Sequence, residues 1–110
     1  MQELPLYVAN PEHAPKLGAL FQREPPNLEA LAFFNSAIAS RYDVRAQLGA
    51  IRAPTLVLTG DHDFFGKAAA DEIVAGIPDA TLVLLQRAGH FAWLDAPDRF
   101  REEVGRFLTT

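Results

Sequence analysis

Two short apolar segments, each followed by a glycine and ionisable side chains, form the clearest pattern along the chain. The first covers residues 56–58 and turns at Gly60 into a loop that contains Asp63, and the second covers residues 81–85 and leads to His90. Both segments are too short for helices, and their content favours parallel strands buried on both faces. Because ligands bind at the carboxyl ends of strands in open α/β sheets, the acid and the histidine are expected on one edge of one sheet.

Apolar residues at helical spacing fill most of the remaining chain. A helix between the two strands predicts parallel pairing through a right-handed crossover, with Gly76 in the left-handed position after the helix. His13, in the first helix, is expected to face solvent, and residues 2–9 are compatible with a short strand or an extended lead-in. The expected helices begin at the Asn10-Pro11 start, the Asn27 cap, Arg41 (with Asp43 as cap), Lys67 and the Asp95 cap. Their inward-facing residues are expected to include Leu17, Val44, Leu48, Ile51, Ala70, Ile73, Val74, Phe100, Val104, Phe107 and Leu108.

The composition excludes several classes of protein. The chain has 110 residues, enough for one small domain, and its 49% apolar content is ordinary for a folding chain. A net charge of −4 gives no electrostatic footprint for nucleic acid, and no basic segment suggests a membrane surface. No apolar stretch approaches the roughly 20 residues of a membrane-spanning helix, and the first residues lack a secretory signal. With no cysteine there is no disulfide framework or thiolate ligand set, so a cytoplasmic location is expected.

Ordered motifs give the sequence a family resemblance. The segment P-T-L-V-L-T-G-D-H-D is followed by I-P-D-A-T-L-V-L-L-Q-R-A-G-H-F-A-W-L-D-A-P-D-R-F and then by V-G-R-F-L. Over residues 42–108 this order resembles the C-terminal part of an α/β-hydrolase, with a tail similar to those of proline iminopeptidases and related esterases. The resemblance implies an α/β fold with parallel strands and flanking helices. Residues 51–110 would belong to the hydrolase core, and residues 1–50 to the end of a helical lid and its connection to the core.

The resemblance also implies a catalytic triad, of which this chain carries two members. Asp63, the fourth residue of the G-x-x-D motif, matches the family's acid, and His90 of the G-H motif matches its histidine. The nucleophile elbow G-x-S-x-G is absent, and the only serines are Ser36 and Ser40. In acyl transfer the histidine moves the nucleophile's proton while the acid orients the imidazole. Without a nucleophile and an oxyanion hole, the isolated chain is expected to be inactive.

Neighbouring residues offer alternative interpretations. Asp61 is a rival for the role of acid, whereas His62 is expected to be an exposed loop residue. Asp95, five positions after the predicted catalytic histidine, is expected to cap the last helix. Phe91 and Trp93 are expected in the core, and walls of an active-site pocket are the alternative for both.

The acid loop also bears comparison with metal sites. Four residues match positions 1, 3, 6 and 12 of an EF-hand calcium loop, namely Asp61, Asp63, Gly66 and Glu72. Phe65, however, stands at position 5, where an oxygen ligand is expected, and a strand rather than a helix precedes the loop. A zinc site that joins His62 and His90 to the same loop lacks ligand spacing. The sequence therefore predicts neither a metal nor a cofactor.

Two functional hypotheses follow from these observations. The first is a fragment or subunit of a serine-type hydrolase for small ester, amide or peptide substrates, active only with the missing N-terminal portion. The second is a non-catalytic remnant that serves as an interaction or oligomerisation module. Two parallel strands alone leave unpaired edges, so either hypothesis predicts that the chain self-associates or pairs with a partner.

Overall fold

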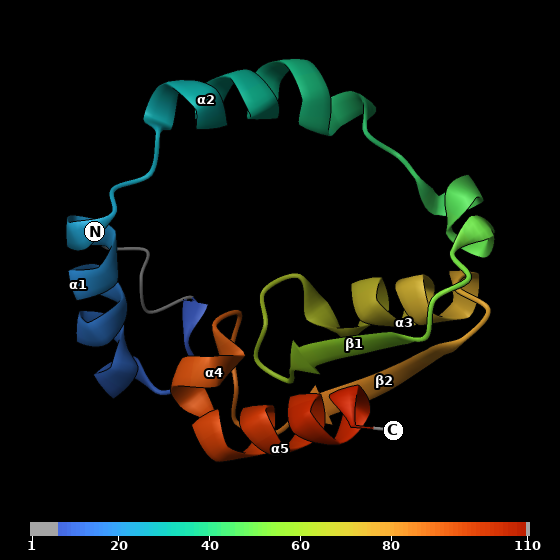
Figure 1. Cartoon of the computed structure of the whole chain (residues 1–110). Helices are drawn as coiled ribbons and strands as arrows, with labels where there is room; N and C mark the ends of the chain where they lie inside the picture. Colours follow the sequence, from blue (N-terminus) through green and yellow to red (C-terminus); the bar gives the residue numbers. More distant parts are fainter. Residues whose placement is uncertain (1–6, 110) are drawn as a thin grey trace.

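A parallel two-stranded sheet is the centre of the computed structural model (Figure 1). Strand β1 (Thr55–Gly60) pairs with β2 (Ala80–Leu85), and the two run in register from Thr55 opposite Ala80 to Gly60 opposite Leu85. The structure describes residues 7–109, so most of the predicted lead-in at residues 2–9 lies outside it. The parallel pairing and the flanking helices confirm the predicted α/β class.

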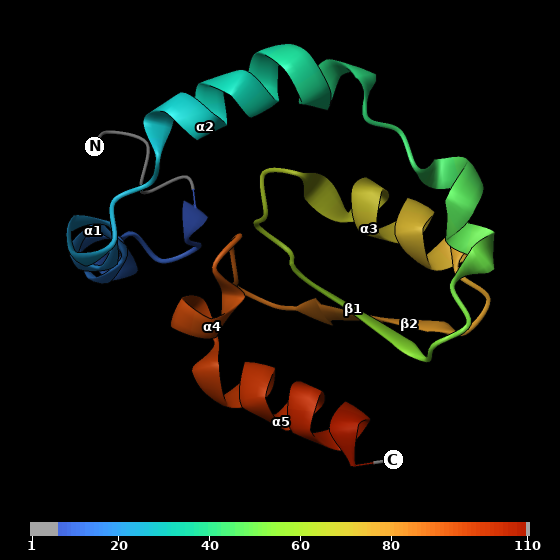
Figure 2. The same cartoon turned by 45° about the horizontal axis from the view of Figure 1, so that its top comes forward.

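The sheet lies between helices, with α3 (Gly66–Gly76) on one face and α5 (Pro97–Leu108) on the other (Figures 1 and 2). A short helix, α4 (Ala92–Asp95), leads into α5, and its first residue packs against the fully buried Leu85 at the end of β2. Residues 55–59 of β1 are only half-buried, so the prediction of strands buried on both faces is wrong for this chain. Within residues 7–109, one main helix per face and an unpaired edge on each strand leave the sheet partly accessible.

Two glycines serve close packing between segments. A Cβ atom on Gly60 would lie 2.1 Å from the carbonyl oxygen of Ala88, so only glycine allows the loop after β2 to approach β1. Gly76 belongs to α3, and a Cβ atom there would lie 2.7 Å from Cδ1 of Leu48. The predicted left-handed position at Gly76 is therefore wrong. Left-handed backbone occurs instead at Gly66, where the acid loop enters α3 with a φ of 77°.

A second small core joins the N-terminal segment to the loop after β2. A 3-10 turn, η2 (Pro11–His13), precedes α1 (Ala14–Arg23), and the side chain of Asn10 accepts a hydrogen bond from the first turn, as predicted. Leu17, which is 1% exposed, packs with Val8 at the centre of this core. Phe91 and Leu94 pack against these two residues, which attaches the first helices to the region that carries His90.

Residues 24–43, between α1 and β1, form an exposed helical arch (Figures 1 and 2). Helix α2 (Leu28–Phe33) begins at the predicted Asn27 cap and continues into a π-helical turn, η3 (Phe34–Ile38), and a 3-10 turn, η4 (Ala39–Arg41). Every residue from 22 to 43 is exposed. The Cα radius of gyration, 15.7 Å, exceeds the about 13 Å expected for a compact domain of this length. The arch therefore exposes a set of large apolar side chains, namely Leu28, Leu31, Phe33, Phe34, Ile38 and Tyr42.

The short helix expected from Arg41 is a 3-10 helix, η5, that covers only Arg45–Ala50. The Asp43 carboxylate accepts a hydrogen bond from Arg45 N at 3.1 Å, and the Arg45 guanidinium also reaches Glu72 of α3. Hydrogen bonding to Arg45 lowers the pKa of Asp43 to about 2.

Three residues expected to face inward are instead exposed, because the described elements leave them uncovered: Ile51, Ile73 and Leu108. None of the helices between residues 7 and 109 has the length and apolar character needed to cross a membrane.

Candidate active site

Backbone hydrogen bonds join the loops that follow the two strands. Asp61 N donates to Leu85 O at 3.0 Å, and His62 N donates to Ala88 O at 2.8 Å. In return, Ala88 N donates to the Asp61 carboxylate at 3.2 Å. Since Gly60 adds no side chain at this point, the two loops lie in direct contact at the carboxyl end of the sheet.

This arrangement brings Asp63 and His90 together. Nδ1 of His90 lies 3.3 Å from both carboxylate oxygens of Asp63. The acid is fixed by its own turn, in which Asp63 N donates to Gly60 O at 3.2 Å and Phe65 N donates to Asp63 Oδ1 at 3.1 Å. The side chain of Asp63 is 12% exposed and that of His90 is 37% exposed. The carboxylate is thus sheltered, while the imidazole remains accessible to a reacting group.

Aromatic rings surround the imidazole of His90. The distances from its ring centroid are 5.0 Å to Phe64, 5.4 Å to Phe65, 5.4 Å to Phe91 and 6.0 Å to Tyr7. Phe64 and Phe65 are exposed, so together these rings form an open apolar rim. Phe91 is half-buried and packs both against the N-terminal core, as predicted, and against His90, the alternative. Trp93 is exposed and lies edge-on against Phe91, so its predicted place in the core is wrong.

Asp61, the rival acid, is directed at other partners. Its Oδ1 lies 2.6 Å from Nδ1 of His62, and the same oxygen accepts the Ala88 N–H. The hydrogen bond with His62 lowers the pKa of Asp61; burial opposes this effect, and the N–H groups of Arg87 and Ala88 support it. His62 is exposed, as predicted. Asp61 therefore ties the loops together, and Asp63 is the acid that contacts His90.

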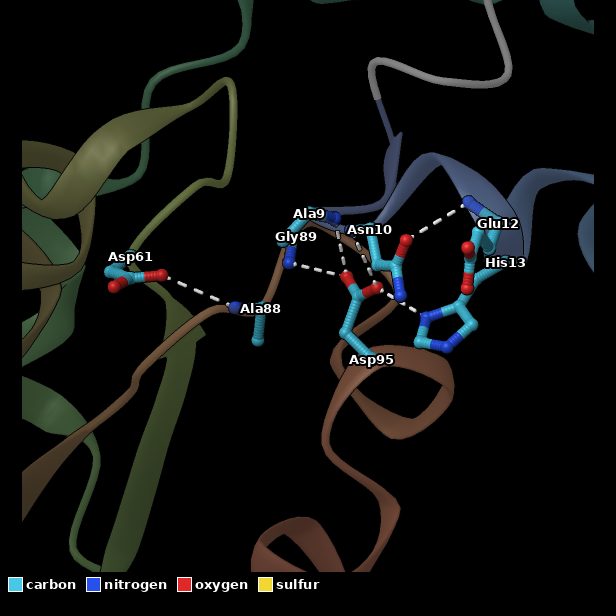
Figure 3. Close-up of polar contacts among 8 residues, drawn as sticks. All are labelled: Ala9, Asn10, Glu12, His13, Asp61, Ala88, Gly89 and Asp95. Carbon is cyan, nitrogen blue, oxygen red and sulfur yellow. Dashed lines mark hydrogen bonds and ion pairs between the residues drawn. The ribbon is translucent and has the colours of Figure 1, made fainter.

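A second polar cluster, centred on Asp95, reaches the residue before His90 (Figure 3). The sequence did not reveal it. The Asp95 carboxylate accepts hydrogen bonds from Ala9 N at 2.6 Å, Asn10 N at 3.2 Å and Gly89 N at 2.8 Å. Nδ1 of His13 lies 2.7 Å from Asp95 Oδ1. The predictions of Asp95 as a helix cap and of His13 as a solvent-facing residue are therefore wrong. Helix α5 begins without a side-chain cap, because the acid is turned toward the N-terminal segment instead.

The environment keeps the Asp95 carboxylate ionised. Its side chain is fully buried, and that of His13 is only 23% exposed. Burial by itself raises the pKa of Asp95, but hydrogen bonds from Ala9 N, His13, Gly89 N and Asn10 N outweigh it, so the pKa lies below its ordinary value. Local patterns carry no signal for this cluster, since Ala9 and Asp95 are 86 positions apart.

The described residues offer no metal centre. Between residues 7 and 109, no group of three or more histidine and acidic side chains is close enough to hold a metal ion. The EF-hand comparison fails geometrically as well, because Asp63 turns its carboxylate toward His90 and the N–H of Phe65. The acid loop is thus arranged around an imidazole.

The chain is similar in sequence to several hydrolases, although no protein-family model matches it. It is 35% identical over 92 residues to a 2-hydroxy-6-oxo-6-phenylhexa-2,4-dienoate hydrolase of Burkholderia cepacia, a match that covers 82% of this chain and 32% of that protein. It is 32% identical over 89 residues to a pimeloyl-(acyl-carrier protein) methyl ester esterase of Nitrosospira multiformis, covering 80% of this chain and 34% of the esterase. The chain thus spans about a third of the length of these curated relatives.

A solved structure gives the same result for the fold. An alpha/beta fold family hydrolase from Bacillus anthracis superposes with a TM-score of 0.78 and 24% identity, covering 93% of this chain and 37% of the hydrolase. The narrower resemblance to proline iminopeptidases is not confirmed by these matches. By sequence and by structure, the chain corresponds to a C-terminal part of an α/β-hydrolase-fold enzyme.

Proposed function

We propose that Asp63 and His90 are the acid and the histidine of a serine-type hydrolase site, to which another polypeptide segment contributes the nucleophile. The observation that carries this proposal is the contact between the sheltered carboxylate and Nδ1 of the accessible imidazole. Both residues follow parallel strands at the edge of the sheet where ligands bind in α/β proteins. The site is therefore two thirds of a triad, in the arrangement that such chemistry requires.

The geometry supplies a proton path. With Nδ1 directed at Asp63, Nε2 of His90 is the nitrogen that can take the proton from a nucleophile and return it to the leaving group. The carboxylate holds the proton on Nδ1 and stabilises the imidazolium that forms during this transfer. Ser36 lies on the exposed arch, where its hydroxyl donates to Phe33 O, so neither the site nor its loops supply a serine.

The substrate class we propose is a small ester, amide or related acyl compound with an apolar part. The rim formed by Phe64, Phe65, Phe91 and Tyr7 supports an apolar group beside His90. One curated relative is named as a methyl ester esterase, which fits an ester substrate, and the other is named for a phenyl-substituted oxo-dienoate, which fits the apolar part. We further propose that residues 1–50 correspond to the end of a lid and its connection, and residues 51–110 to the core, in a cytoplasmic enzyme.

Complementation tests the proposal. The chain is mixed with an N-terminal α/β-hydrolase segment that carries a G-x-S-x-G elbow, and hydrolysis of a p-nitrophenyl ester is measured. His90→Ala is expected to lower the activity by about 10³-fold or more, because the general base is lost. His62→Ala, which removes the neighbouring exposed histidine, is the matched control and should retain most of the activity. Equal losses in both variants would contradict the proposed role of His90.

The acids allow a parallel comparison. Asp63→Asn is expected to lower the activity strongly, whereas Asp61→Asn should weaken the loop contact with Ala88 and leave most of the activity. The reverse order would make Asp61 the acid. Both variants keep the size of the side chain, so the comparison isolates the charge.

A second candidate function is an interaction module without catalysis, and the exposed apolar surface supports it. The arch exposes six large apolar side chains, and a hollow of about 320 Å³ opens beside β1, lined by residues that include Val57, Phe65 and Ile73. Sedimentation of the chain at micromolar concentration is expected to show self-association or, with the complementary segment, a stable complex. Association without hydrolysis in any mixture would favour the interaction module. A compact monomer that does not bind the complementary segment would contradict both proposed functions.

A further inference from the structure

We propose that Asp95 is a positioning residue for His90, and that His13 completes the set of donors that fixes Asp95. The inference rests on the proposed function only in that it takes His90 as the reacting histidine. Asp95 acts on His90 through the backbone, because its carboxylate accepts the N–H of Gly89, the residue before the histidine (Figure 3).

The backbone is held on both sides of His90. Gly89 N donates to Asp95 Oδ2 at 2.8 Å, and Phe91 N donates to Tyr7 O at 3.1 Å. These two hydrogen bonds flank the histidine in the sequence, so they fix the orientation of its Cα–Cβ bond. The loop that carries His90 has no regular secondary structure of its own, and these contacts take the place of a strand or helix.

The same carboxylate holds the segment against which the loop rests. Its two oxygens accept hydrogen bonds from Ala9 N and Asn10 N, which places the carbonyl of Tyr7 opposite Phe91 N. The approach is close, because a Cβ atom on Gly89 would lie 2.7 Å from Tyr7 O. Asp95, the last residue of α4, therefore links the histidine loop that directly precedes this helix to the N-terminal segment, which is distant in sequence.

Charge and donor count explain why an acid is needed here. Three backbone N–H groups and one imidazole nitrogen converge on the carboxylate, which offers acceptor positions only. An asparagine would turn one of the two acceptor atoms into a donor that faces N–H groups. The close His13–Asp95 pair resembles a second acid–histidine couple, but its carboxylate already accepts hydrogen bonds from three backbone N–H groups. These hydrogen bonds indicate a structural role for Asp95.

Amide hydrogen exchange on the full chain tests the proposal without any assay of activity. In Asp95→Asn, the protection of the Gly89 and Phe91 amides is expected to fall by about tenfold or more, because hydrogen bonds to an ionised group are lost. The amides of β1 and β2 should keep their protection. Asp98→Asn, which changes an exposed acid three positions later, is the matched control and should leave all of these amides unchanged.

The imidazole of His90 provides a second measurement. The ¹⁵N signals of its ring are expected to shift in Asp95→Asn toward those of an unconstrained imidazole, while the strand signals remain. If Asp95→Asn does not fold, His13→Ala, which removes one of the four donors, is measured instead and should accelerate exchange at Gly89 selectively. Unchanged protection at Gly89 and Phe91, or a uniform loss over the whole chain, would overturn the proposal. Failure of the proposed function would appear separately, as loss of complementation without any change in these amides.

Discussion

Gly60→Ala tests the contact on which the site is built. An added Cβ atom would lie 2.1 Å from Ala88 O, 2.5 Å from Ala88 C and 2.6 Å from Gly89 O. Ordinary van der Waals contact begins at 3.4 Å, more than an ångström beyond the shortest of these distances, so the loop after β2 would have to move as a unit. The obstacle is backbone, which cannot turn aside as a flexible side chain can.

The expected cost follows from the contacts that such a movement disrupts. Overpacking costs about 1–3 kcal/mol, and the His62 N to Ala88 O hydrogen bond would contribute about 1 kcal/mol more if it were broken. We expect Gly60→Ala to lower the free energy of unfolding by about 2–4 kcal/mol. The displacement would also carry His90 away from Asp63, because His90 follows the displaced residues directly.

Urea unfolding followed by far-ultraviolet circular dichroism measures this change. Gly105→Ala is the matched control, since nothing lies within 4 Å of an added Cβ atom on this helical glycine. In that variant alanine should stabilise α5 by up to about 1 kcal/mol. A midpoint for Gly60→Ala equal to that of the unmodified chain would refute the packing argument.

Three further changes have defined outcomes. Gly66→Ala should destabilise the chain by about 1 kcal/mol through strain at its positive φ alone, because the space around it is open; urea unfolding measures this. Leu17→Ala should cost about 2–5 kcal/mol by thermal or urea unfolding, whereas Leu20→Ala, on the exposed side of α1, should cost far less. The folded state lowers the pKa of Asp95. The ionised carboxylate therefore stabilises the fold above the unfolded pKa of about 3.9, and this contribution is lost as the pH falls through the lower pKa of the folded state. The stability difference between the unmodified chain and Asp95→Asn should therefore be largest near neutral pH and shrink below about pH 4, and a constant difference would contradict this.

Local patterns in the sequence were sufficient for the elements around the sheet. The apolar segments at 56–58 and 81–85 became β1 and β2, and the helical spacing between them became α3. Since both strands run the same way, their following loops had to share an edge, which explains why Asp63 and His90 could be paired in advance. The spacing of apolar residues and the order of the elements are therefore sufficient to predict the strands, the helix between them and the shared edge of the sheet.

Contacts between distant segments could not be predicted in the same way. A glycine after a helix can mark a left-handed turn or a close approach, and Gly76 proved to be the second, against Leu48. Asp95 looked like a helix cap because caps are local, yet its partners are Ala9, Asn10 and His13, which only the folded chain brings near. The exposure of the arch could not be predicted either. An apolar stripe shows which face of a helix tends to be buried, but it does not show which segment packs against that face.

The tautomer of His90 tests the central claim most directly. In a ¹⁵N-labelled chain above the titration range of histidine, the long-range ¹H–¹⁵N spectrum of the imidazole shows which nitrogen carries the proton. Because Asp63 faces Nδ1, we predict a proton on Nδ1 that is lost to Nε2 in Asp63→Ala and retained in Asp61→Ala. A proton on Nε2 in the unmodified chain, or an Nδ1 proton indifferent to Asp63→Ala, would contradict the acid–histidine couple.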